Sequence, residues 1–322
     1  MKKSLFVVFI TTAFLAVSCQ KDSDGRLANE SIVKFFVEAP EIGTRAFGDG
    51  TIANDLYYGI YDETGNLVSA ISKIDDNNKS SINISTTITL KLVTGNTYSM
   101  IFWADNTNDV CDVDFAAKTM SFNPECANQE TYDAFWAYVE PFKVEDNITK
   151  TVKLYRPFAQ LNIGTNDIED ASNAGMTVAE SQITVTTPTL LNLVTGEVSE
   201  EQTVSYAFAS TPEEETFPVE GYEYLSMNYL LVGAEKSTID VEFGYADEES
   251  EYSREFSFVP VQRNYRTNIF GSILTSDVNV NIIIEPAFNE PDYIINDESK
   301  SEDDNNAENG GETVEGDVDM AS

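Results

Sequence analysis

Few side chains in this chain of 322 residues offer distinctive chemistry, and its three cysteines stand out among them. Histidine is absent, which removes imidazole as a general base, a triad member or a metal ligand. Cys19 follows an apolar segment near the start of the sequence, whereas Cys111 and Cys126 lie within its central part. The chemistry open to these residues is therefore thiol chemistry, which means acylation, oxidation to a disulfide, or an unreacted buried thiol.

Cys19 stands directly after a segment with the pattern of an export signal. Two lysines are followed by the apolar run 5–17, which is too short to span a bilayer. The small residues before Cys19 resemble the lipobox of bacterial lipoproteins, in which cleavage leaves an acylated N-terminal cysteine. We therefore expect 1–18 to be a lipoprotein signal peptide, Cys19 to carry the lipid, and the polar segment 19–30 to form a tether. A plain secretory signal with an incidental cysteine is the alternative.

The other two cysteines are expected to form a disulfide. Disulfides persist in exported proteins, and a bridge between Cys111 and Cys126 would close a short loop worth about 3 kcal/mol in the chain-entropy model. Two buried free thiols are the alternative. A metal site made from two sulfurs without histidine is disfavoured.

Composition excludes several classes of function. The chain carries 55 acidic against 19 basic residues, a net charge of −36, which disfavours nucleic acids and anionic lipids as partners. No glycine-rich phosphate loop, nucleophile elbow or metal-ligand cluster is present, so we expect no enzyme activity and no cofactor. The acidic stretch 105–114 is not an EF-hand, because Ala116 stands where its last carboxylate would be, but an irregular calcium site stays open.

The sequence pattern is that of strands separated by turns, which predicts an all-β protein. About 300 mature residues suit two tandem β-sandwich domains, placed at 31–165 and 166–296. A short helical turn is expected near 133–138. The tail 297–322 holds ten acidic residues and one lysine and is expected to be disordered. The expected strands are 32–38, 55–61, 67–71, 84–93, 97–104, 150–163, 182–186, 204–209, 222–232, 238–245, 251–261 and 278–284.

Several strings together resemble the fimbrillin-like lipoproteins of Bacteroidetes, which belong to the type V pilin group of major fimbrial subunits. They are 43–47 (GTRAF), 101–105 (IFWAD), 155–165 (YRPFAQLNIGT) and 262–271 (QRNYRTNIFG). The resemblance covers the mature chain up to about Asn296. The polar segment 20–25 is similar to signals that send lipoproteins of these bacteria to the outside of the outer membrane.

The resemblance implies two transthyretin-like β-sandwich domains and a surface-exposed, lipid-anchored outer-membrane protein. Such a protein acts as a fimbrium-like structural or adhesive subunit: an anchor, an accessory protein, or a stalk or tip component. In polymerising members an arginine-specific protease removes the first strand, and another subunit's segment fills the groove by β-strand addition. Arg45 and Ala46 lie where such a cut belongs, after the expected strand 32–38, although Arg45 as an ordinary loop residue is equally open. The implied partners are the membrane, other fimbrial subunits or further copies, and a host or glycan ligand.

Two features leave alternatives open. The only apolar piece between the last expected strand and the acidic tail is 292–296, and two or three large side chains are too few for a lasting polymer joint. The competing function is that of a glycan-binding surface lipoprotein in a polysaccharide-uptake system. Its sugar platforms would be tryptophans and tyrosines, of which Trp103 is expected in the core; the candidates are Trp103, Trp136, Tyr138, Tyr222 and Tyr224.

Overall fold

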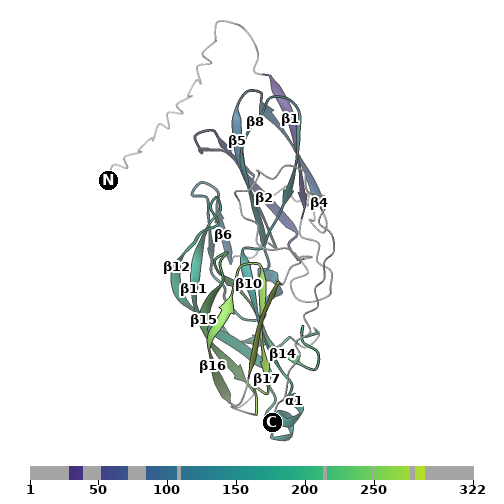
Figure 1. Cartoon of the computed structure of the whole chain (residues 1–322), viewed down its shortest axis with the longest axis vertical. Coiled ribbons are helices and arrows are strands. Elements are labelled where there is room, and N and C mark those ends of the chain that lie inside the picture. The colour runs from purple at the N-terminus through teal and green to yellow at the C-terminus, as the bar shows by residue number, and fades with distance from the viewer. Residues whose placement is uncertain are drawn as a thin grey trace, which may run out of the picture.

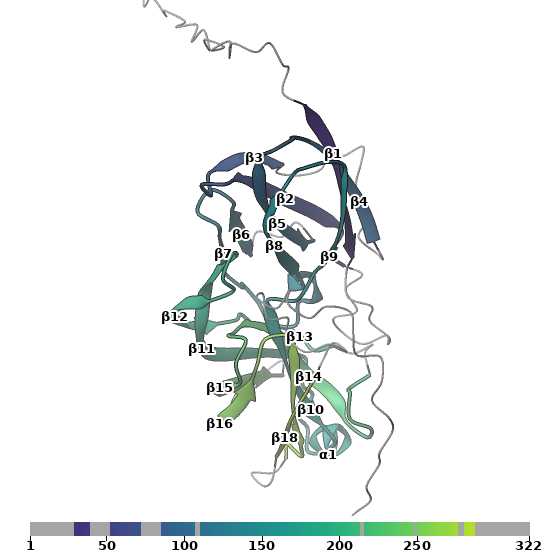
Figure 2. The same cartoon turned by 45° about the horizontal axis from the view of Figure 1, so that its top comes forward.

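The computed structural model of the chain is an elongated stack of two β-sandwiches (Figures 1 and 2). It describes residues 29–38, 52–71, 85–106, 110–212, 216–247, 250–275 and 280–286. The predicted signal peptide, Cys19, the tether up to Ala28, Arg45, Ala46 and the tail 297–322 lie outside the described residues.

Almost all regular structure is strand, so the predicted all-β fold is confirmed. The strands of the first half are β1 (Glu30–Glu38), β2 (Asp55–Asp62), β3 (Leu67–Ile71), β4 (Ser85–Val93), β5 (Thr97–Asp105), β6 (Cys111–Asp114), β7 (Thr119–Phe122), β8 (Phe135–Lys143) and β9 (Ile148–Lys153). Those of the second half are β10 (Phe158–Thr165), β11 (Glu180–Asn192), β12 (Val198–Ser205), β13 (Ala209–Ser210), β14 (Glu223–Leu231), β15 (Ser237–Ala246), β16 (Glu251–Val261), β17 (Tyr265–Gly271) and β18 (Asn281–Pro286). The helical elements of the described residues are η1 (Glu130–Tyr132) and α1 (Ile168–Asn173).

The first sandwich packs a three-stranded sheet, in the order β4-β1-β9, on a four-stranded sheet, in the order β3-β2-β5-β8. Alternate residues of each strand point inward, because side chains in a strand alternate between its two faces. On β5 this places Tyr98, Met100 and Phe102 in the core between the sheets. The opposite face of β5 is also buried, and its Trp103 packs toward the second sandwich.

The second sandwich packs the sheet β14-β10-β17-β18 on a seven-stranded sheet whose path is β16-β15-β11-β7-β6. Strands β12 and β13 also pair with β11. The core contains Leu161 and Ile163 from β10 and Val241 and Phe243 from β15. Strand pairing therefore assigns β10, which lies within the expected domain 31–165, to the second sandwich.

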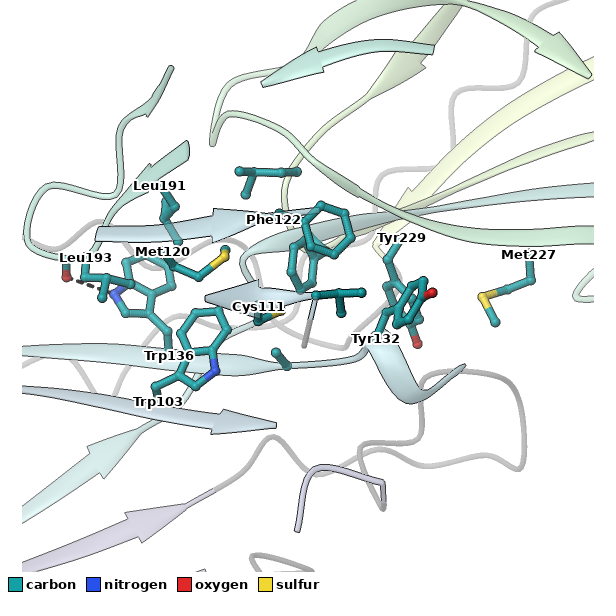
Figure 3. Close-up of a cluster of buried hydrophobic side chains, with 14 of the residues drawn as sticks. Trp103, Cys111, Met120, Phe122, Tyr132, Trp136, Leu191, Leu193, Met227 and Tyr229 are labelled. Carbon is teal, nitrogen blue, oxygen red and sulfur yellow. Dashed lines mark hydrogen bonds between the residues drawn. The ribbon is translucent and has the colours of Figure 1, made fainter. Parts of the chain in front are cut away.

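The two sandwiches are packed against each other and are not separate domains on a linker, because one hairpin and one buried cluster connect them. The hairpin β6–β7 precedes β8 in the chain but adds to the sheet of the second sandwich, where Met120 lies opposite Leu191. A buried cluster then fills the space between the sandwiches (Figure 3). Within it the indole Nε1 of Trp136 donates to the backbone carbonyl of Leu193 at 3.0 Å. We call this cluster the junction; it comprises Tyr61, Ile101, Trp103, Val110, Cys111, Phe115, Met120, Phe122, Tyr132, Ala134, Trp136, Phe158, Leu191, Leu193, Phe217, Tyr224, Met227, Tyr229, Leu231 and Phe270.

Three predicted elements are wrong, one of them the strand 204–209, which the structure divides between the end of β12 and the start of β13. The expected helical turn at 133–138 is largely strand, because β8 pairs with β5 and brings Trp136 opposite Trp103. The expected strand 150–163 is two strands, since β9 pairs with β1 and β10 pairs with β14 and β17. Among the described residues no helix is long or apolar enough to cross a membrane.

Candidate functional site

The first strand of the structure holds an unusual position for a segment so close to the start of the fold. β1 lies at the centre of its sheet, antiparallel to β4 over nine residue pairs and parallel to β9 over six. Removing it would leave β4 and β9 without a partner between them, with their backbone donors and acceptors facing an empty slot. We call this position, bounded by β4, β9 and the core beneath, the β1 slot.

Three side chains fill the slot. Val33, Phe35 and Val37 point inward and are completely buried, as strict alternation along β1 requires. The Phe35 ring lies 5.6 Å from that of Phe102 and 5.8 Å from that of Phe142, measured between ring centroids. Burying each such side chain contributes about 1.5 to 3 kcal/mol of stabilisation. An extended segment with three apolar residues at alternate positions would therefore be stabilised when it binds in the slot.

Hydrogen bonds hold both ends of β1. At its start, the backbone N–H of Ile32 donates to Asn147 Oδ1 at 2.8 Å, and the hydroxyls of Ser31 and Thr94 lie 2.8 Å apart. At its end, the N–H of Leu154 donates to the carbonyl of Glu38 at 2.9 Å. These contacts set the register of β1 and mark out the length of strand that the slot accepts.

The second sandwich contains a strand with the same pairing pattern, but that strand lies in the middle of the chain. Its strand β10 is likewise antiparallel to one neighbour, β14, and parallel to the other, β17. Every residue of β10 is buried, and β9 leads directly into it through 154–157. β10 is therefore held in mid-chain, whereas β1 is the first strand of the part of the chain that the structure describes, so of the two strands β1 is the one suited to exchange.

The predicted protease site and lipidation site lie beyond what the structure describes. Arg45 and Ala46 fall in 39–51, between β1 and β2, and Cys19 precedes the first described residue, Asn29. The position of Arg45 in the chain still places it after the strand that would be released. Its cleavage and the lipidation of Cys19 stay predictions.

The predicted disulfide is absent from the structure, in which Cys111 and Cys126 are both free thiols. Cys111 opens β6 and is buried in the junction, and burial raises the pKa of its thiol well above the ordinary value. The Cys126 sulfur instead lies 3.6 Å from the Tyr132 hydroxyl. Burial also raises the pKa of Tyr132, to about 12. The two sulfurs are thus held by different elements, which spacing in the sequence could not reveal.

The two tryptophan candidates and Asp114 of the acidic stretch are used by the fold, whereas Tyr138 and Tyr222 are half-buried. Trp103 is fully buried and its Nε1 donates to Asp105 at 2.8 Å, while Trp136 is 5% exposed, so neither indole offers a sugar platform. Asp114 Oδ1 accepts hydrogen bonds from the backbone N–H groups of Ala116 and Ala117 and thereby caps a turn. Among the residues that the structure describes, no three histidine, cysteine or acidic residues gather where they could bind a metal ion.

A buried ion pair at the junction was not predicted. Arg156 Nε lies 2.6 Å from Asp133 Oδ1, and both side chains are at most 1% exposed. The guanidinium also stacks over Phe135, 4.6 Å from its ring centroid, and a second buried arginine, Arg263, lies over Trp136 at 5.4 Å. The sequence signal was an arginine between Tyr155 and proline in an apolar stretch, which is too weak to indicate burial.

These features can be set beside known proteins. The model of a family described as "Family of unknown function (DUF6562)" matches residues 30–315, and its match begins at the first residue of β1. No curated protein matches the sequence. Among solved structures, a Bacteroides thetaiotaomicron protein provisionally described as polysaccharide-binding (DUF1812) is 11% identical. Its TM-score is 0.51, and the match covers 82% of this chain and 100% of that one.

Two further structures have TM-scores below 0.5. One is a protein from Bacteroides thetaiotaomicron provisionally described as an adhesin, with a TM-score of 0.49, 13% identity, and coverage of 80% of this chain and 97% of that chain. The other is the fimbrial anchor protein Mfa2 from Porphyromonas gingivalis, with a TM-score of 0.46, 10% identity, and coverage of 79% and 98%. At such identities the DUF1812 structure establishes a shared fold and no more. Because the family model spans most of its length, the chain belongs to the DUF6562 family of unknown function.

Proposed function

We propose that this protein is a lipid-anchored, surface-exposed subunit of the outer membrane that acts by contact, as a fimbrium-like structural or adhesive component. In this proposal it joins other subunits, or further copies of itself, through the β1 slot. The observation that carries the proposal is the position of β1: it is the first strand of the fold, yet it lies between two partners at the centre of its sheet.

The energetics favour exchange over simple loss of the strand. A protein without β1 would expose the inner faces around Phe102 and Phe142 and leave two strand edges unpaired. A donated strand with the pattern of Val33, Phe35 and Val37 restores both the burial and the backbone hydrogen bonds. Release of β1 thus creates a binding site for an extended segment of another molecule.

The junction fits a component that carries load. The β6–β7 hairpin, the shared cluster and the stacking of Arg263 over Trp136 tie the two sandwiches into one body. A subunit that transmits force benefits from such a connection, because interfaces this apolar resist relative motion of domains. A non-enzymatic role agrees with this architecture.

Cys19 supports the proposed location. A cysteine acylated after signal cleavage would hold the protein on the membrane, with the polar residues 19–28 between the lipid and β1. The fold is then presented outside the bilayer, where β1 is accessible to a protease, and cleavage after Arg45 would separate the fold from β1 and from the lipid on Cys19 together. The competing glycan-binding function loses its best aromatic candidates, because Trp103 and Trp136 are buried in the junction.

The test is cleavage by an arginine-specific protease. The purified mature protein should give a folded product that begins at Ala46, and this product should form ladders of oligomers on mildly denaturing gels. The variant Arg45→Ala should stay monomeric under the same treatment and serves as the control. A product that is cut after Arg45, loses β1, and stays monomeric would refute strand exchange between copies of this chain.

A further inference from the structure

The outward face of the β4-β1-β9 sheet differs in charge from the rest of this acidic protein. Residues opposite one another in register share a face, so Ile32 groups with Lys91, and Lys34 with Thr89 and Thr149. We call this surface the basic face; its exposed residues are Ile32, Lys34 and Phe36 on β1, Thr87, Thr89 and Lys91 on β4, and Thr149, Thr151 and Lys153 on β9, and Glu30 and Glu38 lie on the same side at the two ends of β1.

The strands of the second sandwich carry a very different balance of acidic and basic residues. Of the four lysines on the three strands of this sheet, Lys34, Lys91 and Lys153 lie on the basic face, whereas Lys150 stands over the Phe142 ring; the two glutamates of these strands, Glu30 and Glu38, stand at the ends of β1. The strands of the seven-stranded sheet contain nine acidic residues and one arginine, Arg254. In a chain of net charge −36, the basic face therefore gathers lysines in the middle of a sheet whose acidic residues stand only at the ends of β1.

Two further properties make the basic face suited to binding. Lys34 and Lys91 form no ion pair with any other residue in the described part of the chain, so their charges are available. Ile32 and Phe36, on either side of Lys34 on β1, are each 41% exposed. Large apolar residues on an outward strand face are covered in many proteins by a partner segment.

We propose that the basic face binds the acidic C-terminal segment 297–322 of the same molecule. That segment contains ten acidic residues against one lysine, which makes it complementary to Lys34 and Lys91. It follows Pro286, the last residue of β18, by 10 residues, and the 36 residues after Pro286 span up to about 120 Å when extended. The segment is therefore long enough to reach the first sandwich from the second.

Repulsion from the rest of the molecule directs the segment to this face. Elsewhere the acidic side chains of the strands raise the energy of a second acidic segment, whereas the exposed lysines lower it. The apolar residues of the tail, Val314, Val318 and Met320, can also cover Ile32 and Phe36. The attraction is between solvent-exposed charges, so it weakens as salt rises. This inference does not depend on lipidation or on strand exchange.

Zero-length carbodiimide cross-linking of the unmodified mature protein tests the proposal, with peptide mapping by mass spectrometry. An equal mixture of isotope-labelled and unlabelled protein separates links within one molecule from links between two. We expect tail carboxylates joined to Lys34 and Lys91 within one molecule, with at least a fivefold lower yield at 0.5 M than at 0.05 M salt. Lys236, an exposed lysine of the second sandwich, is the matched internal control.

Protease sensitivity of the tail supplies a second readout that does not require the lysines to react. The variant Lys34→Gln/Lys91→Gln should lose its tail to a Glu-specific protease at least threefold faster than the unmodified protein, and Lys236→Gln should not. Links mainly between two molecules, links to Lys236 as frequent as those to the basic face, or no links and no change in tail cleavage would each overturn the proposal.

Discussion

The substitution Phe35→Ala isolates what β1 contributes to the fold, because its neighbour Phe36 provides a matched control. Phe35 is fully buried between the rings of Phe102 and Phe142, whereas Phe36 points outward and is 41% exposed. Truncating a buried phenylalanine removes its transfer free energy and leaves a cavity, which together cost about 3 to 5 kcal/mol. Phe36→Ala removes the same atoms from a surface position and should cost under about 1 kcal/mol.

Urea unfolding of both variants measures the difference. We expect Phe35→Ala to lower the midpoint strongly and Phe36→Ala to lower it little, with the slope m unchanged in both, since m reports the surface exposed on unfolding. A register shift of one residue would reverse the two side chains. Equal losses, or a larger loss for Phe36→Ala, would therefore refute the assignment of the inward face of β1 and with it the β1 slot.

Three other predictions concern the junction, the thiols and the anchor. Asp133→Asn should destabilise the protein by about 3 to 5 kcal/mol in urea unfolding, because it leaves the Arg156 charge buried and unpaired; a loss under 1 kcal/mol would contradict that burial. Mapping of the unreduced protein should recover Cys111 and Cys126 as free thiols, with Cys111 alkylated more slowly before denaturation, whereas a linked peptide would restore the disulfide. Cys19→Ala should release the protein from membranes, and unchanged partitioning into the detergent phase would remove the lipid anchor from the account.

Local patterns predicted the elements that depend on local sequence. Alternation of apolar and polar residues gave β3 at 67–71 and β16 at 251–261 with the bounds that the structure has. It gave β1 within two residues at its start. Such strands carry their own signal, because one face of each is buried and the other is not.

Elements defined by distant partners could not be predicted in the same way. β6 and β7 have four residues each and are strands because they pair with each other and because β7 pairs with β11. β10 was recognised as strand-forming, but its membership in the second sandwich depends on β17, about a hundred residues further along. Gly164 shows the same dependence, since a Cβ there would lie 2.5 Å from the Phe217 ring, which arrives from a distant segment.

The candidate site was predicted in part. The sequence indicated a first strand followed by Arg45, but not that the strand lies between β4 and β9, because parallel pairing with β9 joins residues more than a hundred positions apart. The ion pair between Arg156 and Asp133 escaped notice for a related reason: burial of a charge depends on the surrounding fold and leaves little trace in composition.

The most direct test of the account is binding of a strand in place of β1. Protein cut after Arg45 and freed of the released segment should bind a fluorescent peptide of residues 29–38 in one-to-one stoichiometry, with recovery of the stability lost on cleavage. A peptide carrying Phe35→Asp and Val37→Asp should not bind, because it would place two carboxylates in the apolar core. Equal binding of both peptides, or binding of neither to a product that stays folded, would contradict the claim that the β1 slot accepts a donated strand.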